Sequence, residues 1–140
     1  MMAHAEVIMI PLANLDGTQG YRITKLELMP KKFGAATDEL RSTVKLYTTK
    51  ETAATQEINF DDSSLIGAAV IGMDTNVELY PLNMGATFDA IPFNQDVYIT
   101  HHNDHGDAKE VNVYFELEQF DLTSLEASTL CLKNMRKSVA

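Results

Sequence analysis

The sequence predicts an all-β protein, a β-sandwich of about eight short strands. Three observations lead to this expectation. Apolar and polar residues alternate with a period of two in several segments, as they do in strands with one buried and one solvated face. Clusters of turn-forming residues separate these segments. The composition, 45% hydrophobic and 22% charged, is that of a folded globular chain.

The clearest strand covers residues 111–118. One face carries Val111, Val113, Phe115 and Leu117, and the other carries Asn112, Tyr114, Glu116 and Glu118. A helix would scatter the same apolar residues around its circumference. We interpret the polar face, including Glu116 and Glu118, as solvated surface.

The same pattern predicts the remaining strands. They cover residues 6–10, 21–29, 42–49, 56–60, 64–73, 76–80 and 96–100. In residues 21–29 the apolar phase changes between Ile23 and Leu26, which predicts a β-bulge near Thr24 and Lys25. The longer apolar run at 64–73, which contains Gly67, predicts a buried strand with close neighbours.

Turn signals fall between these strands. They lie at residues 14–17, 33–35, 61–63, 83–85 and 103–107. Eight strands in two sheets with Greek-key links form a jelly roll, which we favour over other sandwich topologies.

The 140 residues suit one domain, and we divide them into a sandwich over 1–122 and a C-terminal arm over 123–140. Residues 123–126 (TSLE) match a capping box, which predicts a short helix in the arm, although residues 129–132 also fit a strand. The arm is basic through Lys133, Arg136 and Lys137, whereas the body is acidic. The arm is therefore either a mobile C-terminus or a docking segment.

The net charge of the chain restricts the classes of partner that it can bind. A formal net charge of −9 argues against binding to nucleic acid or to an anionic membrane, because both attract cations. The single Cys131 cannot form an intramolecular disulfide. Residues 1–12 lack the features of a signal peptide, and no stretch is apolar enough for a membrane-spanning helix, so we expect a soluble protein.

One cluster suggests metal chemistry, because imidazole and carboxylate groups are metal ligands. Its members are His101, His102, Asp104, His105 and Asp107. However, His101 and His102 would point to opposite faces of a continuing strand. We therefore favour a polar hairpin loop in which Gly106 supplies a positive φ, and keep a metal site as the alternative.

The residues give less support to calcium binding, to catalysis and to sugar binding. The loop acids do not have the spacing of a calcium-binding loop. We find no nucleotide-binding glycine motif and no nucleophile elbow, and we predict neither an enzyme nor a cofactor. Sugar binding is the main rival, because β-sandwiches often present aromatic rings to sugars. The chain has no Trp, and its five Tyr residues are equally explained by packing in the sheets.

Three segments resemble the small jelly-roll decoration or cement proteins on the capsids of tailed bacteriophages. They are residues 21–30 (YRITKLELMP), 42–48 (STVKLYT) and 96–100 (DVYIT) followed by 111–118. The similarity covers most of residues 5–120 and lies in size, strand layout and composition, without a signature motif. It implies a homo-oligomer, usually a trimer, that binds the major capsid protein on the outer capsid surface after assembly in the host cytoplasm.

The sequence thus predicts a non-enzymatic virion protein. Docking is expected through the terminal segments. The candidate residues are Glu6, Val7, Ile8, Lys133, Arg136 and Lys137. The first alternative is a carbohydrate- or receptor-binding module of a phage fibre or tail. The second is a metal-dependent jelly-roll enzyme that uses the cluster at 101–107.

Overall fold

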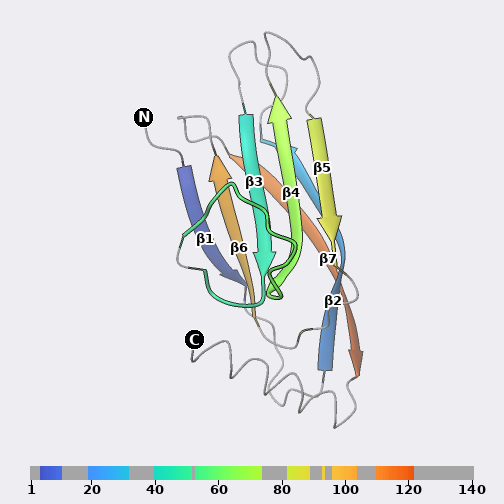
Figure 1. Ribbon diagram of the computed structural model, residues 1–140. Coiled ribbons are helices and arrows are strands. Elements are labelled where there is room, and N and C mark those ends of the chain that lie inside the picture. The colour runs from blue at the N-terminus through green and yellow to red at the C-terminus, as the bar shows by residue number, and fades with distance from the viewer. Residues whose placement is uncertain are drawn as a thin grey trace.

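The computed structural model contains seven strands in the part of the chain that it describes, and no helix there (Figure 1). The described residues are 4–10, 19–31, 40–51, 53–73, 82–88, 93, 96–103 and 110–121. The strands are β1 (His4–Ile10), β2 (Gln19–Pro30), β3 (Leu40–Tyr47), β4 (Leu65–Met73), β5 (Leu82–Thr87), β6 (Val97–Asn103) and β7 (Val111–Asp121).

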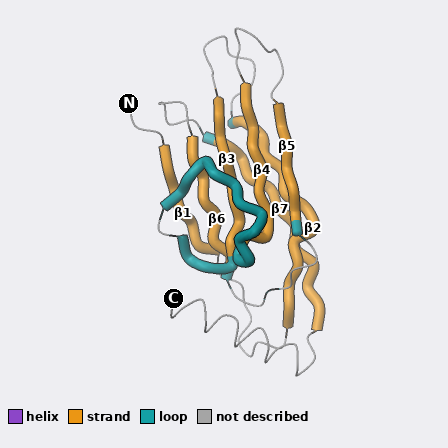
Figure 2. Tube along the Cα trace, in the orientation of Figure 1, coloured by secondary structure: helices purple, strands orange, loops and turns teal. Residues whose placement is uncertain are grey.

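The strands form two antiparallel sheets. One has five strands in the order β1-β6-β3-β4-β5, and the other is a two-stranded ribbon of β2 and β7. Figures 1 and 2 show the ribbon behind the larger sheet, where β2 contacts β4 and β5. The predicted all-β sandwich is confirmed.

The bulge expected in β2 is present. Ile23 pairs with Leu117 and Lys25 pairs with Glu116, so Thr24 is the extra residue on its strand. The Thr24 hydroxyl donates to the main-chain oxygen of Glu116 over 3.2 Å. The bulge lets Ile23 and Leu26 both point into the core, although their spacing breaks the alternation.

The core lies between the ribbon and the larger sheet. Its buried apolar side chains come from β2, β3, β4 and β6 together with Phe93, and the apolar face of β7 packs against them. They are Tyr21, Ile23, Leu26, Leu28, Val44, Leu46, Ile66, Ala69, Ile71, Phe93, Val97 and Ile99. The alternating exposure along β7 confirms the face that was predicted for it, with Glu116 and Glu118 exposed.

Gly67 allows the two layers to approach closely. A Cβ atom at this position would lie 3.3 Å from Ile23 Cδ1 and 3.4 Å from Leu26 Cδ2. The glycine thus gives these two side chains room where β2 packs on β4, as its place in an apolar run suggested.

The strand predicted at residues 56–60 is wrong. These residues form an irregular segment, and Phe60 is 63% exposed. The backbone turns here, since the Asp62 amide donates to the Asn59 carbonyl and the Asp61 amide donates to the Asn59 side chain. The apolar spacing of Ile58 and Phe60 therefore misled the prediction, while the turn expected at 61–63 is confirmed.

The turn predicted at residues 83–85 is also wrong, because these residues lie in β5. Asn83 pairs with Ile71, and Gly85 pairs with Ala69. An added Cβ at Gly85 would make only ordinary van der Waals contacts, 3.5 Å from Ala69 Cβ and 3.6 Å from the Leu26 carbonyl oxygen. Gly85 is therefore a paired strand residue that does not make a turn.

Other strand predictions differ in extent or fall outside the described residues. β6 continues through His101 and His102 to Asn103, three residues beyond its expected end at Thr100. The turn predicted at 103–107 begins too early, because Asn103 lies in β6. The rest of that turn, at 104–107, the strand predicted at 76–80 and the arm at 123–140 lie outside the described residues. The eight-stranded jelly roll stays a prediction.

Replacing Gly67 with Val should destabilise the fold by about 1–3 kcal/mol, because the new methyl groups would overlap Ile23 and Leu26. Gly85→Ala is the matched control, since its Cβ would meet only ordinary van der Waals contacts and should change stability by less than about 1 kcal/mol. Urea unfolding followed by circular dichroism measures both. Equal stability of Gly67→Val and wild type would contradict the packing described here.

Candidate functional site

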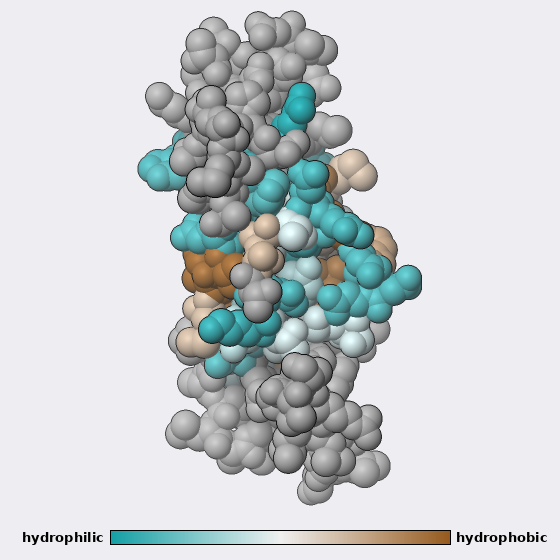
Figure 3. Space-filling model, turned by 60° about the vertical axis from the view of Figure 1, so that its left-hand side comes forward, coloured by the Kyte–Doolittle hydropathy of each residue, from teal (hydrophilic) through white to brown (hydrophobic). Residues whose placement is uncertain are grey.

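β1 is one edge of the five-stranded sheet. It pairs with β6 from His4 to Ile10 without a register shift. Val7, Ile8 and Met9 are 37%, 46% and 52% exposed. Successive strand residues point to opposite faces, so apolar surface is exposed on both sides of this edge. Figure 3 brings the β1 side of the molecule forward and shows apolar surface bordered by polar surface.

The other sheet edges differ from β1. β5 contacts β2, and the Asn83 amide donates to the Leu28 carbonyl over 2.9 Å. β7 carries the exposed acids Glu116, Glu118 and Asp121. Charged side chains on an edge disfavour pairing with another chain, and β1 has only one, Glu6. β1 is therefore the edge best suited to accept a strand.

Three of the predicted docking residues lie on this edge. Glu6, Val7 and Ile8 are adjacent in β1 and all are exposed. Lys133, Arg136 and Lys137 lie outside the described residues.

The histidine cluster divides between the two faces of β6. His101 Nε2 lies 3.1 Å from the hydroxyl of Ser42, a residue on the core side of β3, whereas His102 pairs with Thr43. The two imidazoles thus point to opposite faces, as expected. Across the described ranges, no three His, Cys, Asp or Glu side chains are grouped as a metal ion would need. Asp104, His105 and Asp107 lie outside those ranges.

The face of the larger sheet opposite the ribbon is crossed by the irregular residues 48–51 and 53–64, which we term the strap (Figure 2). Lys45 of β3 points toward the strap and is only 3% exposed. Its ammonium group donates to Thr55 Oγ1 over 3.0 Å and to the Glu57 carbonyl over 2.6 Å. One lysine thus attaches the strap to the sheet.

The surroundings of Lys45 shift several ionisation equilibria. Burial lowers the pKa of Lys45, and the nearby acids Glu51, Glu57 and Asp62 oppose this effect. Burial, with repulsion from Glu51 and Asp62, raises the pKa of Tyr47 to about 12. The pKa of Glu51 is raised by burial and by Asp62. Each shift favours the uncharged form of its group, as expected for a dry contact. The cluster attaches the strap, and its ammonium group is too enclosed to receive a ligand.

A groove of about 710 Å³ lies on the outer face of the ribbon, beside β5. Its lining combines charged, amide, aromatic and apolar side chains. They are Lys25, Glu27, Leu28, Met29, Asn83, Asn112, Val113 and Tyr114. The strand register creates this group, because Glu27 pairs with Tyr114 and Met29 pairs with Asn112 across the ribbon.

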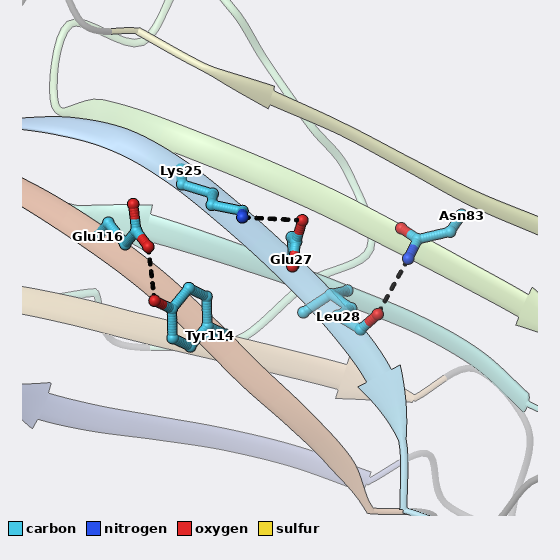
Figure 4. Close-up of polar contacts among 6 residues, drawn as sticks. All are labelled: Lys25, Glu27, Leu28, Asn83, Tyr114 and Glu116. Atoms are coloured by element: carbon cyan, nitrogen blue, oxygen red, sulfur yellow. Dashed lines mark hydrogen bonds and ion pairs between the residues drawn. The ribbon is translucent and has the colours of Figure 1, made fainter.

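Tyr114 is the central aromatic residue of the groove. Its side chain is 52% exposed, and its hydroxyl donates to Glu116 Oε1 over 2.5 Å (Figure 4). This hydrogen bond raises the pKa of Tyr114, because it favours the protonated phenol. Lys25 Nζ lies 5.8 Å from the ring centroid and 3.5 Å from Glu27 Oε1. The ring is thus held in place with much of its surface open to solvent.

Sequence reasoning missed both the buried lysine and the groove. Lys45 lies on the face of β3 opposite Val44 and Leu46, and nothing in the alternation showed that the strap covers it. Tyr114 was placed on the exposed face of its strand. Its neighbours Lys25 and Glu27 depend on the ribbon register, which one sequence does not contain.

Comparison with family models, with curated proteins and with solved structures finds no match for this chain. In the described part of the chain, no helix is long and apolar enough to cross a membrane. The functional argument therefore depends on the surfaces described above.

Replacing Lys45 with Met should loosen the strap and lower the free energy of unfolding by about 1–2 kcal/mol, since two hydrogen bonds from a charged donor are lost. Hydrogen exchange of the amides at 53–64 should speed up. Lys50→Met, which removes an exposed cation within the strap itself, is the control and should leave exchange unchanged. Unchanged exchange in Lys45→Met would show that other contacts hold the strap.

Tyr47 should make the protein less stable in alkali. The unfolded chain loses the phenol proton near pH 10, whereas the folded protein keeps it to about 12. The folded state therefore binds more protons in this window, so stability falls as the pH rises from 10 to 12. The fall is at most about 2.7 kcal/mol, the equivalent of two pKa units. Tyr47→Phe should decline less over this range in urea unfolding, and identical slopes would contradict the assignment.

Proposed function

We propose that this chain is a non-enzymatic structural protein of a virus particle, a decoration or cement protein that binds the major capsid protein. The observation that carries the proposal is the unprotected edge of β1. Native proteins usually blunt exposed edges with charges, prolines or bulges, and β1 has none of these devices beyond Glu6.

The occupant of this edge is an extended segment of the major capsid protein. Main-chain hydrogen bonds to β1 would supply affinity, and the side chains of Val7, Ile8 and Met9 would supply apolar contacts on both faces. A partner other than a second copy is favoured by charge, since each copy carries a net −9.

Two further features support an outer location on the particle. The acidic body would be repelled by packaged nucleic acid and suits the exterior, where it also suppresses random association. The trimer implied by the resemblance to phage decoration proteins would carry three β1 edges. Several weak contacts on one lattice then act together through a high effective concentration.

A carbohydrate- or receptor-binding module of a fibre or tail is the second candidate. The groove around Tyr114 favours it, because the groove joins an exposed ring to amide and carboxylate groups. The two candidates use different surfaces, so each can be tested separately.

Co-expression with the major capsid protein encoded by the same genome tests the proposal. The chain should cosediment with assembled shells on a sucrose gradient at a fixed ratio and raise their heat resistance. The double variant Val7→Lys with Met9→Lys should reduce the bound fraction at least about tenfold, because lysines on an edge oppose strand addition. Met84→Lys is the control, since Met84 is an exposed apolar residue on β5.

Thermal unfolding must first show that the β1 variant remains folded. With folding established, shells that bind the double lysine variant as well as wild type would exclude β1 as the docking edge. Absence of the wild-type chain from the shell fractions would overturn the capsid role itself.

A further inference from the structure

The residues of the groove are arranged for a polar ligand with one apolar face. They lie on β2, β5 and β7, and strands hold side chains more rigidly than loops do. Asn83 is fixed by its bond to the Leu28 carbonyl, and Tyr114 is fixed by its bond to Glu116 (Figure 4). We propose that this groove binds a neutral oligosaccharide of hexopyranose rings.

The ring of Tyr114 supplies the platform. A hexopyranose presents a face of C–H groups, which packs on an aromatic ring while its hydroxyl groups remain at the rim. Met29, on the same face of the ribbon, extends the apolar surface near the ring. An exposed aromatic ring next to a 67% exposed methionine is costly to leave in water, so covering both favours binding.

The polar rim matches sugar hydroxyl groups, which both donate and accept hydrogen bonds. Lys25 and the amide of Asn112 can donate, and the Glu27 carboxylate can accept. The amide nitrogen of Asn83 is used by Leu28, which leaves its oxygen to accept. Both kinds of partner therefore surround the ring.

Charge excludes the other ligand classes. One cation, Lys25, and two carboxylates, Glu27 and Glu116, lie around the ring, so an anionic sugar would meet net negative charge. A cationic ligand would have to displace the Lys25 ammonium, which already lies 5.8 Å from the ring centroid beside Glu27. A neutral polar ligand avoids both costs.

The volume sets the size of the ligand. A groove of about 710 Å³ falls in the range of small-molecule sites and accommodates about two or three hexose rings. The site is open, so we expect weak binding, with dissociation constants of about 1 mM, and selection by ring stereochemistry at Tyr114.

A nitrogen-15 NMR titration tests the proposal with named probes. Maltotriose, cellotriose and a galactose trisaccharide are the neutral probes, 3′-sialyllactose is the anionic probe and trilysine is the cationic probe. At least one neutral sugar should shift amides of 25–29, 83 and 112–114 and leave those of β1 unchanged. Tyr114→Ala should weaken that binding at least about tenfold, equivalent to losing one aromatic contact.

Tyr114→Phe tests whether the ring or the hydroxyl group matters for binding, because it keeps the ring and removes only the bond to Glu116. It should bind within about threefold of wild type, and Met84→Ala, outside the groove, should bind equally well. Binding of trilysine or sialyllactose in place of the neutral sugars would overturn the proposal. So would a flat titration with all three neutral probes. Neither result bears on capsid binding through β1.

Discussion

The β-bulge at Thr24 is the constraint on which most of this structure depends. Before it, Tyr21 and Ile23 face the core, and after it Leu26 and Leu28 do. Without the extra residue, Lys25 and Glu27 would replace the two leucines inside, and their desolvation would be prohibitive. The bulge therefore determines both the core face and the outer face of β2. It completes the core against Gly67, and it places Lys25 and Glu27 beside Tyr114 on the outer face.

The two faces of the larger sheet are covered by different physical means. The ribbon covers one face through apolar packing, which depends on shape complementarity and includes a tight contact at Gly67. The strap covers the other through a buried lysine, whose hydrogen bonds offset the cost of taking its charge from water. The raised pKa values of Tyr47 and Glu51 have the same origin, because the strap excludes solvent from all three groups.

The sequence predicted the elements whose burial follows a simple period. The alternation in β7 and the phase change in β2 each record which residues face the core, so both strands and the bulge were found. The sequence-based prediction failed where residue types that are typical of one element occur in another. Gly85 is typical of a turn but pairs with Ala69 inside β5, and Ile58 with Phe60 has the spacing of a strand in a segment that turns. The groove could not be predicted because it joins residues almost ninety positions apart through a register that only the fold specifies.

The two candidate surfaces lie at opposite ends of the larger sheet. β1 is one edge strand, and the groove lies beside β5, the other edge strand. A partner strand added to β1 would extend the sheet away from β5, so it would leave Tyr114 and its neighbours uncovered. Under the two proposals, capsid binding at β1 and sugar binding at the groove could therefore occur at the same time. Apolar exposure on both faces of β1 suits attachment through several such edges acting together, whereas the open groove suits single weak contacts. Attachment and recognition therefore need not compete for the same residues.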